Sequence, residues 1–154
     1  MKLFKMSESE FKQWAPQSQS AFADDKLKAN SLTREEADKI ASESFLRLLP
    51  LGLETKDNFL YCLKNEQSEI LGYLWFRLQG PIENRCAFVC DILIEAPHRG
   101  QGLGKMVMLF AESEAKKLGA NRIGLHVFGF NSVAIGLYTS LGYQTTDLVM
   151  EKPI

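Results

Sequence analysis

Residues 98–105 have the sequence HRGQGLGK, a composition that suits an anion-binding loop. The glycines at positions 100, 102 and 104 leave the main chain open to close approach, and Arg99 and Lys105 add positive charge. An apolar stretch precedes the loop and a helical pattern follows it. The loop therefore leads into a helix N-terminus, where free N–H groups and the helix dipole favour a phosphate. The alternative is a glycine-rich turn that binds no ligand.

The spacing of the loop excludes two common nucleotide motifs. The dinucleotide motif G-x-G-x-x-G needs its third glycine one place later than Gly104. The phosphate loop of nucleotide triphosphatases needs Ser or Thr after the lysine, and Met106 stands there. The expected phosphate ligand is therefore of another kind.

Two further residues have side chains suited to proton transfer. Asp91 lies inside the apolar stretch CAFVCDILIE, where a carboxylate is costly unless it has a partner. It is a candidate base, or a residue that locks the sheet through hydrogen bonds. Histidine is the side chain type best suited to take up a proton in the physiological range, so His126 is the other candidate base, with a structural role as the alternative. His98 is expected to lie exposed beside the loop. The three cysteines lack the spacing of a metal site or a disulfide framework, so no metal is expected. The sequence also shows no serine triad.

The hydrophobic periodicity predicts a mixed α/β fold with the order β-α-α-β-β-β-α-β-α-β. Thr33 and Glu36 form a capping box that starts the second helix. The expected strands cover 3–6, 59–64, 70–78, 86–95, 122–128 and 143–152, and the expected helices cover 7–29, with an interruption near Pro16, 33–49, 102–118 and 131–141.

Four segments resemble the GCN5-related N-acetyltransferase (GNAT) superfamily: RGQGLG at 99–104, DILIEAPHRG at 91–100, LHVFGFNSVAIGLYTSLGY at 125–143 and DLVMEK at 147–152. The resemblance is strong over 86–152, and residues 1–85 match only in the order of their elements. It implies one domain over 1–154, with an acceptor side at 1–85 and an acetyl-CoA-binding and catalytic half at 86–154. It also implies a sheet of six or seven strands that contains a splayed pair of parallel strands.

The resemblance implies acetyl-CoA as cosubstrate and a role for each matching residue. Tyr138 would be the general acid, His126 or a water the base, and Asp91 a further catalytic candidate. The alternatives are a helix N-cap for Asn131 and a half-buried aromatic for Tyr138. The implied cofactor-binding residues are the strand residues Ile92, Leu93 and Ile94, the loop residues Arg99, Gly100, Gln101, Gly102, Leu103, Gly104 and Lys105, and Asn131 and Tyr138.

The implied activity is transfer of an acetyl group to the primary amine of a small molecule or peptide. The alternative is a catalytically silent CoA-binding sensor or interaction module. The net charge of −1 and the pI near 6.1 give no global basic field for nucleic acid or an anionic membrane. With no apolar run of about 20 residues and no visible secretory signal, the expected location is cytoplasmic. A monomer or a homodimer is expected.

Overall fold

The computed structural model describes residues 1–152 and 154, which form one five-stranded sheet and four α-helices. Neighbouring strands pair in sequence order, antiparallel from β1 to β4 and parallel between β4 and β5. The mixed α/β class is confirmed. The strands are β1 (Lys2–Lys5), β2 (Asn58–Lys64), β3 (Ile70–Gln79), β4 (Cys86–Ile94) and β5 (Arg122–Leu125), and the helices are α1 (Glu8–Ala29), α2 (Arg34–Leu48), α3 (Leu103–Lys117) and α4 (Ser132–Ser140).

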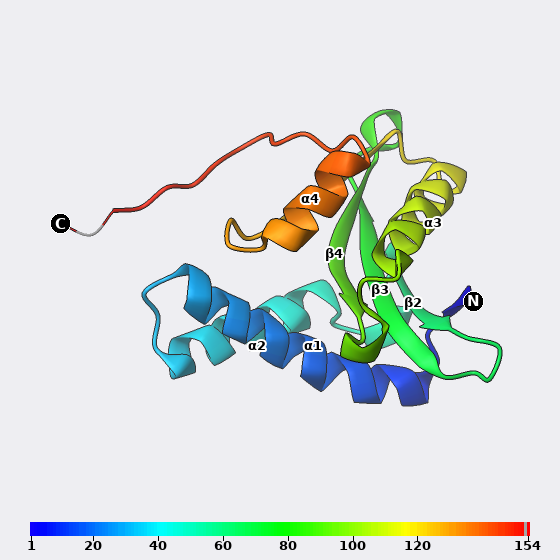
Figure 1. Cartoon of the computed structure of the whole chain (residues 1–154), viewed down its shortest axis with the longest axis horizontal. Coiled ribbons are helices and arrows are strands. Elements are labelled where there is room, and N and C mark those ends of the chain that lie inside the picture. The colour runs from blue at the N-terminus through cyan, green and yellow to red at the C-terminus, as the bar shows by residue number, and fades with distance from the viewer. Residues whose placement is uncertain (153) are drawn as a thin grey trace.

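Strand alternation divides the core between the two faces of the sheet. Leu74 and Phe76 of β3 pack in one cluster with Val107 of α3 and Tyr138 of α4. Tyr73 and Trp75, which alternate with them, belong to a second cluster that contains Trp14 of α1. The clusters place α1 on one face of the sheet and α3 and α4 on the other. Figure 1 shows α1 and α2 running together in the lower part of the view, with α3 and α4 above them. None of the helices in the described part of the chain is long and apolar enough to cross a membrane.

Three aromatic rings fix α1 and α2 on their face of the sheet. Trp14 packs edge-on against Trp75 with ring centroids 5.8 Å apart, and Phe45 of α2 lies 5.9 Å from Trp14 and 5.5 Å from Trp75. Edge-to-face and tilted contacts at such distances are favourable beyond the apolar area that they bury. Further along, the small side chains of Ala23, Ala37 and Ala41 are buried where the two helices meet. This pair of helices forms one wall of the cavity described below.

The predicted interruption of the first helix near Pro16 is wrong, since α1 runs without a break from Glu8 to Ala29. A proline in a helix interior lacks an N–H and crowds the carbonyl of the preceding turn. Pro16 is exposed, whereas Trp14 and Ser18 on either side of it are buried. Tertiary packing on both sides therefore holds the helix together through the proline.

The predicted six or seven strands are wrong, because the described chain forms five. Residues 143–152, expected as the closing strand, pair with no strand in the described chain and run away from the body in Figure 1. Leu148, Val149 and Met150 are 80–90% exposed there. The pattern of these residues resembles a strand, but a strand forms only where a neighbour supplies hydrogen bonds. The strand expected at 122–128 also stops early, at Leu125.

Strand β4 contains a bulge that changes which side chains face α1. Trp75 pairs with Asp91 and Phe76 pairs with Val89, so Cys90 is an extra residue without a partner on β3. A bulge shifts the alternation of the following residues by one. As a result Asp91 points toward α1, whereas uninterrupted alternation from Phe88 would have placed Ile92 there.

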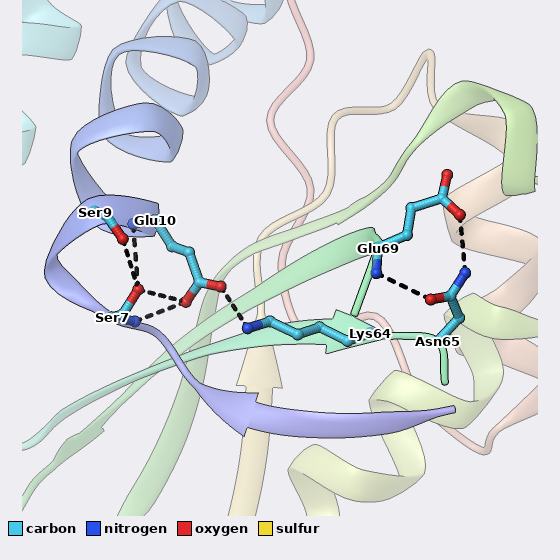
Figure 2. A network of polar contacts seen from close by, with 6 residues as sticks. All are labelled: Ser7, Ser9, Glu10, Lys64, Asn65 and Glu69. Atoms are coloured by element: carbon cyan, nitrogen blue, oxygen red, sulfur yellow. Dashed lines mark hydrogen bonds and ion pairs between the residues drawn. The ribbon is translucent and has the colours of Figure 1, made fainter. Parts of the chain in front are cut away.

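A polar network joins the start of α1 to β2, as Figure 2 shows. Ser7 caps the helix and exchanges hydrogen bonds with Glu10 in a capping box. The other carboxylate oxygen of Glu10 lies 2.5 Å from the ammonium of Lys64, a residue at the end of β2. Burial alone would raise the pKa of Glu10, but the bonds from Lys64 and Ser7 outweigh it and lower the pKa to about 2.

Glu10→Gln should lower the free energy of unfolding at pH 7 by about 1–2 kcal/mol, because it removes a charge-assisted hydrogen bond. A lowered pKa stabilises the folded state above the unfolded pKa of 4.5, and that contribution fades as pH falls toward about 2. Urea unfolding at pH 7, 4 and 2.5 should therefore show a shrinking difference between variant and wild type. Glu8→Gln, in the same helical turn, is the matched control and should show a smaller effect. A pH-independent difference would contradict this account.

Candidate functional site

A cavity of about 420 Å³ lies between the helix pair α1–α2, strands β3 and β4, and the segment that leads from β5 into α4. Its volume falls within the range of small-molecule sites. Asp91 and Ile92 of β4, His126, Asn131 and Tyr138 all line it. The structure thus brings together, around one space, five residues that are spread over 48 positions of the sequence.

Strands β4 and β5 are paired only at their starts. The parallel ladder runs from Cys86–Arg122 to Val89–Leu125 and ends there, whereas β4 stays paired with β3 as far as Ile94. The β5-facing edge of residues 90–94 therefore has no strand partner in the described chain. Ile92, Leu93 and Ile94 lie along this edge, and an extended ligand could add there as a strand would. The predicted splayed pair of parallel strands therefore corresponds to β4 and β5, whose pairing ends at Val89–Leu125.

The glycine loop connects the end of β4 with α3. Gly100 and Gly102 have φ angles of +75° and +78°, in the left-handed region that favours glycine. Gly102 is the N-cap of α3, and no side chain caps this helix. A Cβ at either glycine would meet no atom within 4 Å, so open space lies beside the main chain. The first N–H groups of α3 are thus available to an anion.

The other loop residues have more local contacts. A Cβ on Gly104 would lie 3.1 Å from Leu137 of α4, so this glycine allows α3 and α4 to pack closely. Leu103 is buried in the core. The Arg99 side chain donates to the carbonyl of Ile94 at 2.8 Å, and Gln101 donates to the carbonyl of Pro97 at 3.4 Å.

Two charged residues near the loop remain to be placed. Lys105, in the first turn of α3, is exposed. His98, expected to be exposed, is half-buried, with Nε2 3.5 Å from a carboxylate oxygen of Glu69. Lys105 and Arg99 are thus the exposed cations of the loop, and Arg99 already donates a hydrogen bond to the carbonyl of Ile94.

Asp91 joins β4 to α1. Its Oδ2 accepts hydrogen bonds from Trp14 Nε1 at 3.2 Å and from Ser18 Oγ at 2.5 Å. Burial raises the pKa of Asp91, and the bonds from Ser18 and Trp14 oppose that rise. Trp14 and Ser18 are one helical turn apart and so face the same way. Sequence reasoning missed this pair, although their i, i+4 spacing was the available signal.

Tyr138 is 8% exposed and projects from α4 into the cavity. Burial raises the pKa of its hydroxyl, and the charge of Asp91 raises it further. The hydroxyl is therefore protonated at neutral pH and can donate a proton or a hydrogen bond. Its ring packs 5.8 Å from that of Tyr143, whose hydroxyl in turn donates to Glu112 at 3.1 Å.

His126 and Asn131 lie at the exposed side of the cavity. His126 follows the last residue of β5, so the expected placement on a strand is wrong; its ring packs edge-on to Phe128 at 4.9 Å. Asn131 caps α4 by accepting a hydrogen bond from the N–H of Ala134 at 3.1 Å. The helix-cap interpretation of Asn131 is confirmed, and its side chain remains exposed beside the cavity.

Cys90 also lines the cavity, but its chemistry is unsuited to nucleophilic attack. Burial raises the pKa of its thiol to about 12, and Arg77 only partly opposes this rise. Because the thiolate is the reactive form, a thiol with such a pKa is inert at neutral pH.

Arg77, from β3, also lines the cavity and was not singled out in the sequence analysis. The available signal was its position two residues after Trp75 and four after Tyr73, which places all three side chains on the face of β3 that carries α1.

A family model described as the acetyltransferase (GNAT) family matches residues 10–143. The chain belongs to the GNAT acetyltransferase family. The uncharacterized N-acetyltransferase YycN of Bacillus subtilis is 33% identical over 149 residues, covering 97% of this chain and 96% of YycN. A second uncharacterized N-acetyltransferase of that species, YdgE, is 28% identical over 97% of this chain and 95% of its own length.

The crystal structure of YycN superimposes on this acetyltransferase-family chain with a TM-score of 0.92, covering 99% of this chain and 98% of YycN. A structure from Pyrococcus furiosus, 25% identical, gives a TM-score of 0.72 and covers 99% of both chains. The arrangement of sheet and helices is therefore that of the GNAT acetyltransferases.

Asp91→Ala and Asp91→Asn should differ sharply in stability. Alanine leaves the donors of Trp14 and Ser18 without an acceptor and should cost roughly 2–5 kcal/mol. Asparagine keeps an acceptor oxygen and carries no charge. Because the pKa of Asp91 is raised in the folded state, ionising this carboxyl destabilises the wild type as pH rises, and asparagine avoids that cost. The melting temperature of Asp91→Asn relative to wild type should thus improve as pH rises above the ordinary aspartate pKa of 3.8, where ionisation begins to destabilise the wild type. Equal losses for both variants would contradict the hydrogen-bonding role.

Proposed function

We propose that this protein transfers an acetyl group from acetyl-CoA to a primary amine. The observation that carries the proposal is the meeting of an open edge of β4 with a cavity that Tyr138 lines. A ligand laid along that edge would present its end to the cavity. Family membership supports the acetyl-transfer class.

The chain has groups that fit each part of acetyl-CoA. The N–H groups of 101–105, at the uncapped start of α3, suit the pyrophosphate, and Lys105 adds a positive charge beside them. The main chain of Ile92, Leu93 and Ile94 suits the amide groups of the pantetheine arm. Asn131, exposed at the cavity, is a second contact for that arm. The cosubstrate supplies a thioester whose acetyl group is open to attack by an amine.

Tyr138 is the proposed general acid, because its hydroxyl is protonated at neutral pH and faces the cavity. It would donate a proton to the departing sulfur, or hydrogen-bond to it. The N–H of Ile94 is the proposed donor to the oxygen that becomes negative during acetyl transfer.

The incoming amine must lose a proton, and His126 or a water beside it is the proposed acceptor. His126 is exposed at the cavity, so a proton taken there can pass to solvent. Asp91 suits this task less well than a free carboxylate, because its Oδ2 already accepts hydrogen bonds from Trp14 and Ser18. We therefore assign Asp91 a positioning role, as the link that holds α1 against β4.

The proposal is tested by incubating the purified protein with acetyl-CoA and a panel of amines and measuring release of the CoA thiol. Amine-dependent release is expected. Calorimetry with CoA measures donor binding separately. Binding of CoA without release across a broad panel would favour a silent CoA-binding module, and absence of any CoA affinity in folded protein would overturn the donor assignment as well.

Tyr138→Phe should lower kcat by about 10- to 1000-fold, in keeping with loss of a general acid, and should leave the affinity for CoA unchanged. Tyr143→Phe is the matched control. It removes a hydroxyl from the adjacent ring, whose partner is Glu112, and should cost about 1 kcal/mol of stability with little effect on kcat. Wild-type kcat in Tyr138→Phe would remove the acid role.

Gly102→Val should weaken CoA binding by at least about tenfold, because a branched side chain would fill the space beside the free N–H groups. The left-handed φ of Gly102 also makes any side chain strained, at about 1–2 kcal/mol. Gly119→Val controls for that strain, since Gly119 follows the other end of α3, has a φ of +83° and likewise opens onto free space. Calorimetry on both variants should show a loss of CoA affinity in Gly102→Val alone. Similar affinities in the two variants would contradict the phosphate site.

A further inference from the structure

The guanidinium of Arg77 forms part of the cavity wall on the face of the sheet that carries α1. Arg77 lies on β3 opposite Phe88 of β4, and its side chain is half-buried. Nη2 donates to Oε1 of Gln79 at 3.0 Å, whereas Nε is buried and has no hydrogen-bond partner. A half-buried guanidinium without a counterion is costly unless something else compensates its charge. Because Nε is inaccessible, a ligand in the cavity would have to contact the terminal nitrogens Nη1 and Nη2.

Nothing in the described part of the chain neutralises Arg77. No carboxylate lies within 4.0 Å of its guanidinium in residues 1–152 and 154. Its hydrogen-bonded neighbour Gln79 is neutral, and the nearby Cys90 thiol, with a pKa of about 12, is also uncharged at neutral pH. The positive charge of Arg77 therefore has no counterion among the described residues. Arg77 lines a cavity that is large enough for a small molecule.

The position of Arg77 relates it to the proposed reaction centre. Trp75, two residues before it on β3, pairs with Asp91. Two residues of strand correspond to about 7 Å, so the main chain of Arg77 lies roughly that far along the sheet from the Trp75–Asp91 pair. Tyr138 is close enough to Asp91 for the charge of Asp91 to raise its pKa. A small acceptor could therefore place its amine near Tyr138 and another group near Arg77.

The remaining walls of the cavity suit an acceptor that is partly apolar. Phe22, Phe45, Trp75, Phe88 and Phe128 all line the cavity. Arg47 of α2 and Lys26 of α1 line it as well, so three cationic side chains surround it. Lys26 lies 5.4 Å from the ring of Phe22 and 5.8 Å from that of Phe128, and it carries no ion pair in the described residues.

Two carboxyl groups, those of Asp25 and Asp91, also line the cavity. Asp91 is held by Trp14 and Ser18, and burial raises its pKa. Burial also raises the pKa of Asp25, and its nearest cation is Lys28, at 3.9 Å. Each carboxyl group thus has a donor or a cation of its own, whereas none of the three cations of the cavity forms an ion pair in the described residues.

We infer that the acceptor of this enzyme is an amine that also carries a carboxylate and an apolar group, with Arg77 binding the carboxylate. The inference rests on the proposed acetyl transfer at the same cavity. Arginine presents two parallel N–H donors to a carboxylate, so binding there would both compensate the charge and orient the acceptor. Arg77 is thus a specificity-determining residue, and an acceptor without a carboxylate leaves its guanidinium unpaired.

Two matched pairs of acceptors test the inference: phenylalanine against 2-phenylethylamine, and leucine against 3-methylbutylamine. The members of each pair differ in the carboxylate alone. Wild-type kcat/KM should favour the amino acid by about tenfold or more. Arg77→Gln should abolish that preference, and Arg77→Lys, which keeps the charge without the fork, should restore part of it. Arg122→Gln, at the exposed start of β5 outside the cavity, is the control and should keep the wild-type preference.

Calorimetry on protein saturated with CoA separates this inference from the proposed reaction. Binding of phenylalanine but not of 2-phenylethylamine, lost in Arg77→Gln, supports the carboxylate site even if no thiol is released. Turnover of both members of each pair at equal kcat/KM overturns the inference and leaves acetyl transfer intact. A preference that persists in folded Arg77→Gln overturns the assignment to Arg77. If CoA binds but no acceptor is bound or acetylated, the result overturns both the carboxylate site and the proposed acetyl transfer.

Discussion

The site depends on one buried interaction, the acceptance of hydrogen bonds by Asp91 from Trp14 and Ser18. It connects the middle of β4 to the middle of α1, two elements 73 and 77 residues apart in sequence. A buried carboxyl group would be destabilising by itself, and the two donors compensate for its removal from water. The aromatic contacts of Trp14 with Trp75 and Phe45 surround the same point. Helix α1, which forms one wall of the cavity, is thereby fixed against β4, which forms another.

The bulge at Cys90 makes that interaction possible and coincides with the opening of the sheet. One extra residue turns Asp91 toward α1, and the ladder between β4 and β5 has already ended at Val89. Beyond this point β4 has an edge that no strand of the described chain occupies, while β3 still supports its other edge. A single local irregularity therefore coincides with both features that the proposed reaction needs: an edge for an extended donor and an anchored wall for the acceptor.

The charges of the site are divided between its two ends. Free N–H groups and Lys105 make the glycine loop positive without any buried charge, which suits a diphosphate that stays near solvent. Arg77, Arg47 and Lys26 line the cavity on the other side of the open edge, among aromatic rings. The overall charge of −1 does not reveal either region, because both are local.

The sequence by itself determined most of the helices and strands and the glycine loop at the start of α3. Glycine spacing, the capping box of α2 and the apolar stretch of β4 act over a few neighbouring residues, so they can be found without the fold. The tertiary structure alone decided that α1 continues through Pro16, that residues 143–152 form no strand, and that Asp91 faces Trp14 and Ser18. Arg77 likewise could be singled out only from the structure, because whether a charged side chain has a counterion depends on every element that packs around it. Each of these outcomes depends on packing or pairing between distant segments, which local propensity does not encode.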